Sequence, residues 1–171
     1  MRRINKLFFY KNPYDLTGTE GLFVDAMRDN ADFQYKNCAD YKRILDSRGF
    51  TPADLRTIDD LDKLPFIPTA FLKRHHMFSM PERRMVAKAT SSGTSGGGFS
   101  KVGLELSALL RTGYMSLKMV KDRGLFTLRP CNYIMFGYKP HRTNKMAVTQ
   151  TARATRLLAP TLHVTYALKS N

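Results

Sequence analysis

Cysteine and acidic residues are scarce in this chain of 171 residues, and long hydrophobic runs are missing. The two cysteines, Cys38 and Cys131, lie far apart and form no CxxC pair, which fits a reducing compartment and excludes a zinc ribbon. No apolar run approaches the ~18–20 residues that a membrane span needs. The basic start, residues 1–10, has too short an apolar part for a signal peptide. We therefore expect a cytoplasmic protein with no membrane span and no metal centre.

The 14 acidic residues are outnumbered by 28 lysines and arginines, which gives a formal net charge of +14. Such an excess attracts polyanions, whether a nucleotide, a nucleic acid or an anionic membrane. The basic residues are spread along the chain, and no helix-turn-helix, zinc-finger or RNP signature accompanies them. A basic nucleic-acid-binding module therefore stays open as an alternative, although the motifs do not favour a nucleic-acid partner.

Hydroxyl-bearing residues and glycines are concentrated in residues 89–98, Ala-Thr-Ser-Ser-Gly-Thr-Ser-Gly-Gly-Gly. Glycines let a loop approach a ligand closely, and successive backbone N–H groups in such a loop hold anions. The flanking residues, 84–90 and 101–106, have the pattern of β-strands, so we expect a structural element and not a Ser/Gly linker. A loop of this composition between two strands predicts a grip on a polyphosphate.

The loop does not follow the spacing of two familiar nucleotide-binding motifs. Counted from Gly93, a Walker A loop needs a lysine directly after Gly98, and Phe99 stands there. The glycine spacing also differs from that of a dinucleotide-binding loop that opens a helix. The sequence therefore disfavours both a P-loop NTPase and a dinucleotide-binding fold of this kind.

The Ser-Ser-Gly-Thr-Ser-Gly sequence at 91–96 resembles the phosphate-binding signature of the adenylate-forming superfamily. The stretches before the loop follow one another as they do in phenylacetate-CoA ligases and in the acyl-protein synthetases of bacterial luminescence fatty-acid reductase systems. Those after it are more similar to the acyl-protein synthetases. The resemblance covers most of the chain from about residue 20 onward, in the ordered stretches 38–42, 49–55, 58–68, 133–140 and 163–168.

This resemblance implies that ATP, with Mg²⁺, and a carboxylic acid form an acyl-adenylate before the acyl group passes to a thiol. It further implies a long-chain fatty acid, a protein cysteine as acceptor and an acyl reductase as partner. An aryl-CoA ligase is the alternative within the same chemistry. The loop would hold the β and γ phosphates, so that the α phosphate faces the carboxylate. The phosphate-binding residues implied are Ser91, Ser92, Gly93, Thr94, Ser95 and Gly96, with Lys101 in place of the family's lysine.

Members of the superfamily are considerably longer than this chain. Their adenine-binding segment, catalytic lysine and acyl-accepting cysteine lie downstream of the part that this sequence resembles, so no catalytic residue is assigned here. We therefore expect residues 1–171 to be a single, partial N-terminal domain. It would be a truncated chain, a degenerate enzyme or a split subunit that needs a complementary subunit, and it would be inactive alone.

Hydrophobic periodicity predicts an α/β fold in which a helical region over about 17–80 precedes an α/β region over about 84–171. In the helical region, a capping box at 17–20 predicts the start of one helix. A second helix is expected from about 31 to 47, and Gly49 is expected to end it.

In the second region, a helix is expected over 107–124, where Ser107 is the predicted cap. Strands at 133–136 and 162–168 flank a further predicted helix at 144–158. This alternation predicts part of a parallel or mixed sheet with flanking helices. The resemblance to the superfamily implies that this sheet is part of an incomplete adenylate-forming large domain.

The end of the strand predicted at 133–136 is a second place where a site is expected. In α/β proteins, ligands bind outside the carboxyl ends of the strands. Tyr138 and His141 follow this strand end. We therefore predict both as pocket residues.

Overall fold

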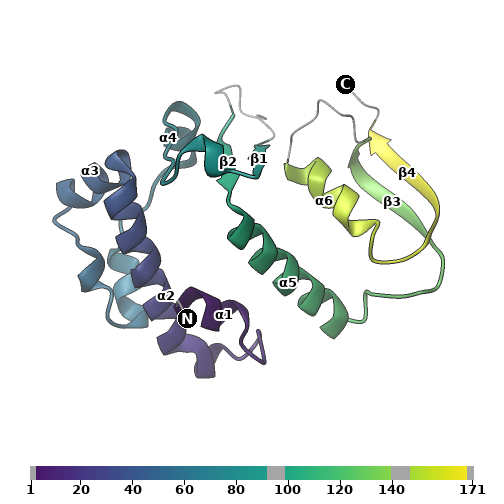
Figure 1. The fold of residues 1–171 in the computed structure, drawn as a ribbon, viewed down its shortest axis with the longest axis horizontal. Helices are drawn as coiled ribbons and strands as arrows, with labels where there is room; N and C mark the ends of the chain where they lie inside the picture. Colours follow the sequence, from purple (N-terminus) through teal and green to yellow (C-terminus); the bar gives the residue numbers. More distant parts are fainter. Residues whose placement is uncertain (1–2, 92–98, 140–146, 169–171) are drawn as a thin grey trace.

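The computed structural model of the chain describes residues 3–91, 99–139 and 147–168. Helices fill the first half, and two short sheets follow (Figure 1). The α-helices are α1 (Arg3–Phe8), α2 (Leu16–Asn37), α3 (Ala39–Ser47), α4 (Thr69–Arg74), α5 (Leu106–Asp122) and α6 (Ala147–Thr155). The strands are β1 (Ala87–Thr90), β2 (Lys101–Leu104), β3 (Cys131–Tyr138) and β4 (Thr161–Leu168), and the 3-10 helices are η1 (Pro52–Asp54), η2 (Ile58–Lys63) and η3 (Glu82–Arg84).

Helix α2 begins two residues earlier than the sequence predicts. The Asp15 carboxylate accepts a hydrogen bond from the Gly18 N–H at 2.8 Å, and the Thr19 hydroxyl donates to the Asp15 carbonyl at 2.5 Å. Asp15 is therefore the N-cap, and the predicted capping box at 17–20 is wrong because its residues already lie inside the helix.

The predicted break between the first two helices is also misplaced. Helix α2 continues through Ala31 to Asn37, and the extended residue Cys38 separates it from α3. Ala31 is buried in the core, so its small side chain serves the packing of α2 and does not mark a boundary. The predicted end of α3 is confirmed, because Gly49 has a φ of +61° that favours glycine.

One hydrophobic core lies where α2, α3 and the two 3-10 helices η1 and η2 meet. Leu45 and Leu55 have no exposed surface, and Ala31 and Phe50 pack with them. Four partly buried side chains surround this cluster: Tyr35, Tyr41, Leu61 and Leu64.

Capping boxes fix the two 3-10 helices at the rim of this core. Thr51 pairs with Asp54 in η1, and Thr57 pairs with Asp60 in η2. Asp60 accepts hydrogen bonds from the backbone N–H groups of Thr57 at 2.8 Å and of Arg56 at 2.9 Å. These local bonds hold the turns that carry Leu55 and Leu61 into the core.

Strands β1 and β2 form an antiparallel hairpin that begins later than the sequence predicts. Residues Glu82–Arg84 form η3, so the strand starts at Ala87 and not at residue 84. The register pairs Ala87 with Leu104 and Thr90 with Lys101.

Helix α5 joins the hairpin to the second sheet and packs against α1. The Arg111 guanidinium donates to the Asn5 side-chain oxygen at 3.2 Å, and the Lys118 ammonium donates to the backbone carbonyls of Tyr10 and Lys11. The helix ends at Asp122, and Gly124, at the predicted end, follows the C-cap residue Arg123 with a φ of +65°. Its N-cap is Glu105, two residues before the predicted cap.

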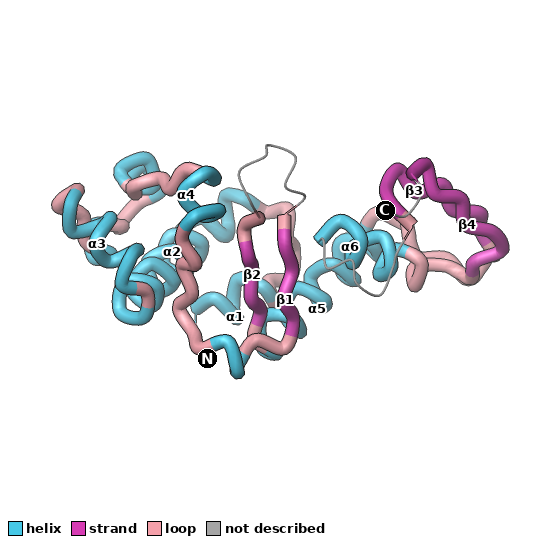
Figure 2. Tube along the Cα trace, turned by 90° about the horizontal axis from the view of Figure 1, so that it is seen from above, coloured by secondary structure: helices cyan, strands magenta, loops and turns pink. Residues whose placement is uncertain are grey.

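Strands β3 and β4 pair in parallel, which confirms the parallel arrangement predicted from the sequence. Helix α6 connects them and packs on one face of the pair (Figure 1). Seen from above, this unit stands at the end of the molecule away from the helical region, and the hairpin lies between them (Figure 2). The fold is thus mixed α/β, with two separate two-stranded sheets in the described residues.

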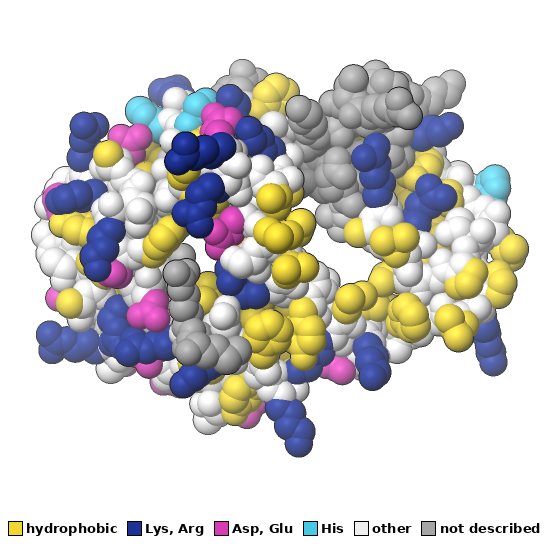
Figure 3. Space-filling model, in the orientation of Figure 1, with side chains coloured by type: hydrophobic (Ala, Val, Ile, Leu, Met, Phe, Trp, Pro, Cys, Tyr) yellow, Lys and Arg dark blue, Asp and Glu magenta, His cyan; other side chains and the backbone are white. Residues whose placement is uncertain are grey.

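Hydrophobic side chains remain on the surface of the second half. Figure 3 shows them gathered over α5 and over the β3–β4 unit. Within the described part of residues 105–171, Ala159, at 8% exposure, is the only buried hydrophobic residue. The core described above therefore does not extend into this half of the chain.

Candidate functional site

The candidate phosphate loop connects the two strands of the β1–β2 hairpin. The Ser91 N–H donates to the Ser100 carbonyl at 3.0 Å, and the Ser100 N–H donates to Ser91 Oγ at 3.0 Å. These two bonds extend the hairpin ladder by one pair and bring both ends of the loop together. The prediction that two strands bracket the loop is confirmed by this geometry.

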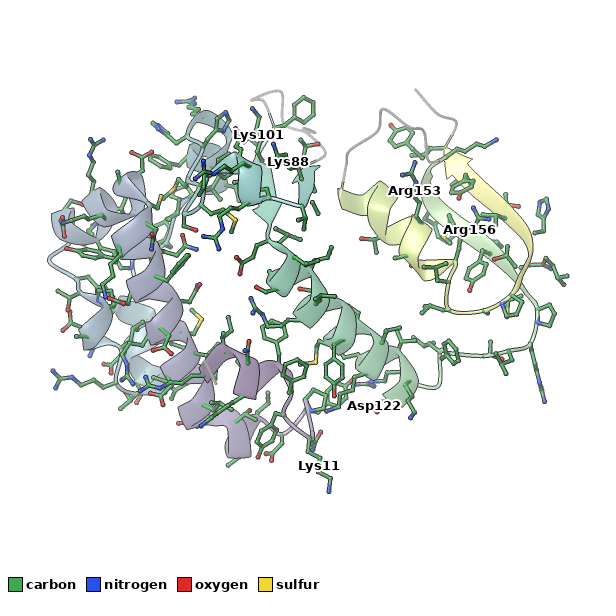
Figure 4. All side chains as sticks on the ribbon, in the orientation of Figure 1. Lys11, Lys88, Lys101, Asp122, Arg153 and Arg156 are labelled. Atoms are coloured by element: carbon green, nitrogen blue, oxygen red, sulfur yellow. The ribbon has the colours of Figure 1, made fainter. Side chains whose placement is uncertain are left out.

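Two lysines share one face of the hairpin beneath the loop. Lys101 lies opposite Thr90, and Lys88 lies opposite Gly103. Because side chains alternate between the two faces of a strand, Lys88 and Lys101 project from the same face. Both are exposed, and Figure 4 shows them side by side on the hairpin. They place two positive charges next to the loop.

A carboxylate accompanies these lysines. Glu82 Oε2 lies 2.7 Å from Lys88 Nζ. This hydrogen bond, together with the charges of Lys88, Lys101 and His76, holds the pKa of Glu82 below its usual range. Since both partners of the pair are exposed, the contact contributes little to stability. An approaching phosphate would meet two lysines against one carboxylate.

Glu105 fixes the junction between the hairpin and α5. Its carboxylate lies 3.7 Å from the Arg84 guanidinium and 3.9 Å from that of Arg111, and it accepts a hydrogen bond from the Ser107 hydroxyl at 2.5 Å. One carboxylate thus links the segment before β1 to the first turns of α5. The direction in which the chain leaves the loop is held by these contacts.

Gly103 has a packing reason to be glycine. A Cβ at this position would overlap the side chain of Met85, which is buried against β2. The close approach of Met85 closes the base of the hairpin on one side. The hairpin is therefore anchored by Met85 as well as by its backbone ladder.

The residues predicted to bind phosphate are only partly placed by the structure. Ser91 lies at the base of the loop, where its oxygen accepts the Ser100 N–H, and an accepting hydroxyl keeps its own hydrogen for a further acceptor. Lys101 lies at the start of β2. The remaining predicted residues lie outside the described part of the chain: Ser92, Gly93, Thr94, Ser95 and Gly96.

The predicted pocket residue Tyr138 is the last residue of β3. It lines a cavity of ≈ 190 Å³ between this strand and α6, together with Met135, Phe136 and Gly137 from the strand and Thr151, Ala152 and Thr155 from the helix. His141, the other predicted pocket residue, lies outside the described residues. The cavity is at the carboxyl end of a parallel strand, as α/β sites are, and its role as a binding pocket stays a prediction.

Three residues of this region, Lys88, Glu82 and Glu105, are not among those predicted from the sequence. A signal for Lys88 was present, because a hairpin closed by Thr90 and Lys101 places residue 88 on the same face as Lys101. Glu82 and Glu105 give no such signal, since neither belongs to a motif. Their contacts depend on how η3 and α5 meet the hairpin.

No group of three His, Cys, Asp or Glu side chains in residues 3–91, 99–139 and 147–168 is arranged to hold a metal ion. Of the helices in that same part of the chain, none has the length and apolar character needed to cross a bilayer.

Comparison with known proteins finds relatives for part of this sequence. It is 34% identical over 78 residues to a phenylacetate-coenzyme A ligase of Aromatoleum evansii, a match that covers 44% of this chain and 18% of that protein. It is 31% identical over 67 residues to a phenylacetate-coenzyme A ligase of Thermus thermophilus, covering 37% of this chain and 15% of the relative. The chain thus spans less than a fifth of the length of these curated relatives. No family model matches it.

Among solved structures, the fold is similar to that of a 2-hydroxyisobutyryl-CoA ligase, crystallised in the postadenylation state in complex with 2-HIB-AMP. The TM-score is 0.56 at 12% sequence identity, and the match covers 92% of this chain and 36% of the ligase. The fold of the chain is therefore similar to part of the fold of this ligase, and the two sequence relatives named above are ligases as well. Neither of these two sequence relatives is an acyl-protein synthetase, so that finer resemblance stays a prediction.

Proposed function

We propose that this chain is the phosphate-binding portion of an adenylate-forming ligase, which activates a carboxylic acid as an acyl-adenylate for transfer to a thiol. The observation that carries the proposal is the Ser/Gly loop closed at its base by Ser91 and Ser100, with Lys88 and Lys101 on one face beneath it. The likeness to phenylacetate-CoA ligases and to the fold of a third ligase supports it.

The proposed ligand of the loop is ATP, with its Mg²⁺. The residues at hand suit a polyphosphate, because lysine side chains and loop N–H groups are donors and neither is an acceptor. When bound, ATP supplies the adenylyl group that the carboxylate takes up. The residues of this chain would hold its outer phosphates, and Lys101 would take the place of the lysine that the family carries after its loop.

Two acids are the candidate substrates. The proposed reaction is the transfer of a long-chain fatty acyl group to a protein thiol, with an acyl reductase as partner. This rests on the resemblance of 133–140 and 163–168 to acyl-protein synthetases. A phenylacetate-like aryl acid with coenzyme A as acceptor is the second candidate, and the sequence identity to phenylacetate-CoA ligases favours it.

The binding of ATP is the first thing to measure. We expect titration calorimetry with ATP and Mg²⁺ to show weak binding to the wild-type chain and at least tenfold weaker binding to Gly93→Asp. The added carboxylate would repel phosphate, and its side chain would occupy space in the loop. Gly21→Asp is the matched control, because it adds the same side chain on the exposed surface of α2, where no other atom lies within 4 Å of the new Cβ.

Three outcomes would count against the proposal. The first is a folded wild-type chain that binds no ATP, and the second is a Gly93→Asp chain that binds ATP as well as the wild type. The third is salt-sensitive retention on DNA without any nucleotide binding, which would favour the basic nucleic-acid-binding module. In a reconstituted enzyme, pyrophosphate exchange that depends on palmitate and not on phenylacetate would favour the fatty-acid substrate, and the reverse dependence the aryl acid.

A further inference from the structure

The positive charge of this chain lies in its second part. Residues 1–62 contain 11 acidic and 10 basic residues, so they are close to neutral. Residues 63–171 contain 3 acidic and 18 basic residues and carry the whole excess. Such a segregated excess marks residues 63–171 as the part of the chain that meets an anionic partner.

Basic residues cluster around the start of the hairpin. Residues 73–101 include six lysines and arginines and two histidines, against a single acidic residue, Glu82. Figure 3 shows lysine, arginine and histidine side chains together over α4 and the hairpin. The six are Lys73 and Arg74 at the end of α4, Arg83 and Arg84 in η3, and Lys88 and Lys101 in the hairpin.

The surroundings of Glu82 show that these segments lie close together. Its carboxylate bonds to Lys88 Nζ at 2.7 Å, and this bond, with the charges of Lys88, Lys101 and His76, lowers the pKa of Glu82. His76 belongs to the segment between α4 and η3. One side chain of η3 is therefore within electrostatic reach of both the hairpin and the segment that follows α4.

Two of these cations are not needed to hold ATP. Arg74 and Arg83 are exposed, and within the described residues neither guanidinium has an ion pair. Arg84, by contrast, lies 3.7 Å from the Glu105 carboxylate. The proposed phosphate grip uses the loop and the two hairpin lysines, so Arg74 and Arg83 add positive charge beside it that a further anion can meet.

Exposed apolar side chains lie next to these cations in the sequence. Val86 precedes Lys88 by two residues and is 57% exposed, and Phe99 precedes Lys101 by two residues and is 55% exposed. Apolar side chains beside lysine and arginine are typical of surfaces that bind at a membrane interface. Phosphates of nucleic acids are contacted by charged and polar groups, and an exposed valine has no partner there. The composition therefore favours lipid over nucleic acid.

We propose that the surface defined by Arg74, Arg83, Val86 and Phe99 docks on an anionic lipid membrane. This inference deepens the proposed function and rests on its fatty-acid form. A long-chain fatty acid is held in the bilayer, because each of its CH₂ groups favours transfer out of water. Docking beside the loop would bring the proposed ATP site to the membrane surface where such an acid has its carboxylate. The hairpin lysines stay with the loop and its phosphates.

Vesicle co-sedimentation of the full 171-residue chain tests this surface. The probes are vesicles of phosphatidylcholine alone and vesicles of equal parts phosphatidylcholine and phosphatidylglycerol. We expect at least tenfold tighter binding to the mixed vesicles, and loss of this preference at about 1 M salt, where charges are screened within about 3 Å. The double variant Arg74→Glu/Arg83→Glu should bind the mixed vesicles at least tenfold more weakly than the wild type.

The matched control is Arg43→Glu/Arg48→Glu, which makes the same change in net charge at two exposed arginines of the near-neutral part of the chain. We expect it to bind the mixed vesicles within about threefold of the wild type, since its changes lie outside the docking surface. Circular dichroism of each variant checks that it is folded.

Four results would overturn the docking surface. They are a folded chain that binds neither kind of vesicle, equal binding to both kinds, a loss in Arg74→Glu/Arg83→Glu no larger than in the control, and tighter binding to duplex DNA than to mixed vesicles of the same phosphate concentration. Failure of the proposed function gives a different pattern, in which the chain binds the mixed vesicles through Arg74 and Arg83 as expected but binds no ATP.

Discussion

Two regions of the molecule differ in how they bury hydrophobic side chains: the helical region, from α2 to η2, and the β3–α6–β4 unit. The first encloses Ala31, Leu45, Phe50 and Leu55 in a core built from neighbouring segments of the chain. The second leaves large side chains on its surface and, among the described residues, buries Ala159 alone. One part of this chain can therefore be stable by itself, whereas the other depends on something else to cover it.

The cause lies in the kind of element that each region uses. Helices joined by short turns bury one stripe each and can close a small core among themselves. A parallel pair of strands exposes two faces, and its single connecting helix covers only one. In the first region, neighbouring segments of the chain bury the apolar faces of the helices. In the second, the connecting helix buries only one of the two faces of the sheet.

Truncating a fully buried side chain in the helical region should have the greatest consequence. Leu55→Ala should lower the free energy of unfolding of that region by about 2–5 kcal/mol, the usual cost of a cavity in a core. Leu128→Ala, which removes the same atoms from a side chain that is 81% exposed, should change it by about 0.5 kcal/mol or less. The readout is hydrogen exchange of the α2 amides combined with urea unfolding. An equal loss of unfolding free energy in Leu55→Ala and Leu128→Ala would contradict the proposed difference between the two regions.

A smaller effect is expected from Asp60, whose carboxylate ties η2 to the core. Hydrogen bonds from the Lys63 ammonium and from the backbone N–H groups of Thr57 and Arg56 hold the pKa of Asp60 far below its usual range. Because the pKa is lowered by folding, the stabilisation is present above the unfolded-state pKa of ~4 and is lost as pH falls below it.

This sign sets the outcome for Asp60→Asn. The variant should unfold at lower urea concentration than the wild type at pH 7, and the gap should narrow at pH 3. Asp59→Asn, in the same 3-10 helix but exposed, should show no comparable gap at either pH. A gap that is constant with pH would mean that the carboxylate charge does not stabilise this turn.

The most modest change is expected at the start of α2, where one cap supports the self-sufficient region. Asp15→Ala removes the acceptor of the Gly18 N–H and should destabilise the helical region by about 1 kcal/mol. Asp15→Asn should restore most of the loss, since asparagine caps helices nearly as well. Thermal unfolding followed by circular dichroism at 222 nm would measure both, and equal melting temperatures for Asp15→Ala and the wild type would show that the cap is not used.

Sequence reasoning succeeded where a single residue decides the local structure. Gly49 and Gly124 lie just beyond the C-terminal ends of α3 and α5, and both have positive φ. It failed at the α2–α3 junction, because Cys38 is not a residue type that ends helices and the break depends on how the two helices pack. Helix α1 was missed for a similar reason, since its contacts come from α2 and α5.

The candidate site shows the same division. The loop and Lys101 are visible in the sequence because spacing and composition define them, and the parallel order of β3 and β4 follows from alternation of strands and helices. The proximity of Lys88 to Lys101 needs the register of the hairpin, and the contacts of Glu105 with Arg84 and Arg111 need the tertiary fold. Long-range contacts of this kind have no local signature.

The hydrogen bonds between α5 and the N-terminal segment fix the rotation of α5 about its own axis. Arg111 bonds to Asn5 of α1 and Lys118 bonds to the backbone of Tyr10 and Lys11 just after it. These two residues of α5 are seven positions apart and so lie within about 20° of each other around the helix. One residue inserted between Lys118 and Gly124 would turn the β3–α6–β4 unit by about 100° relative to the hairpin and move it by about 1.5 Å. Seven inserted residues would restore its azimuth but displace it by about 10 Å. The length of α5 thus sets both the distance and the orientation of the β3–α6–β4 unit relative to the hairpin.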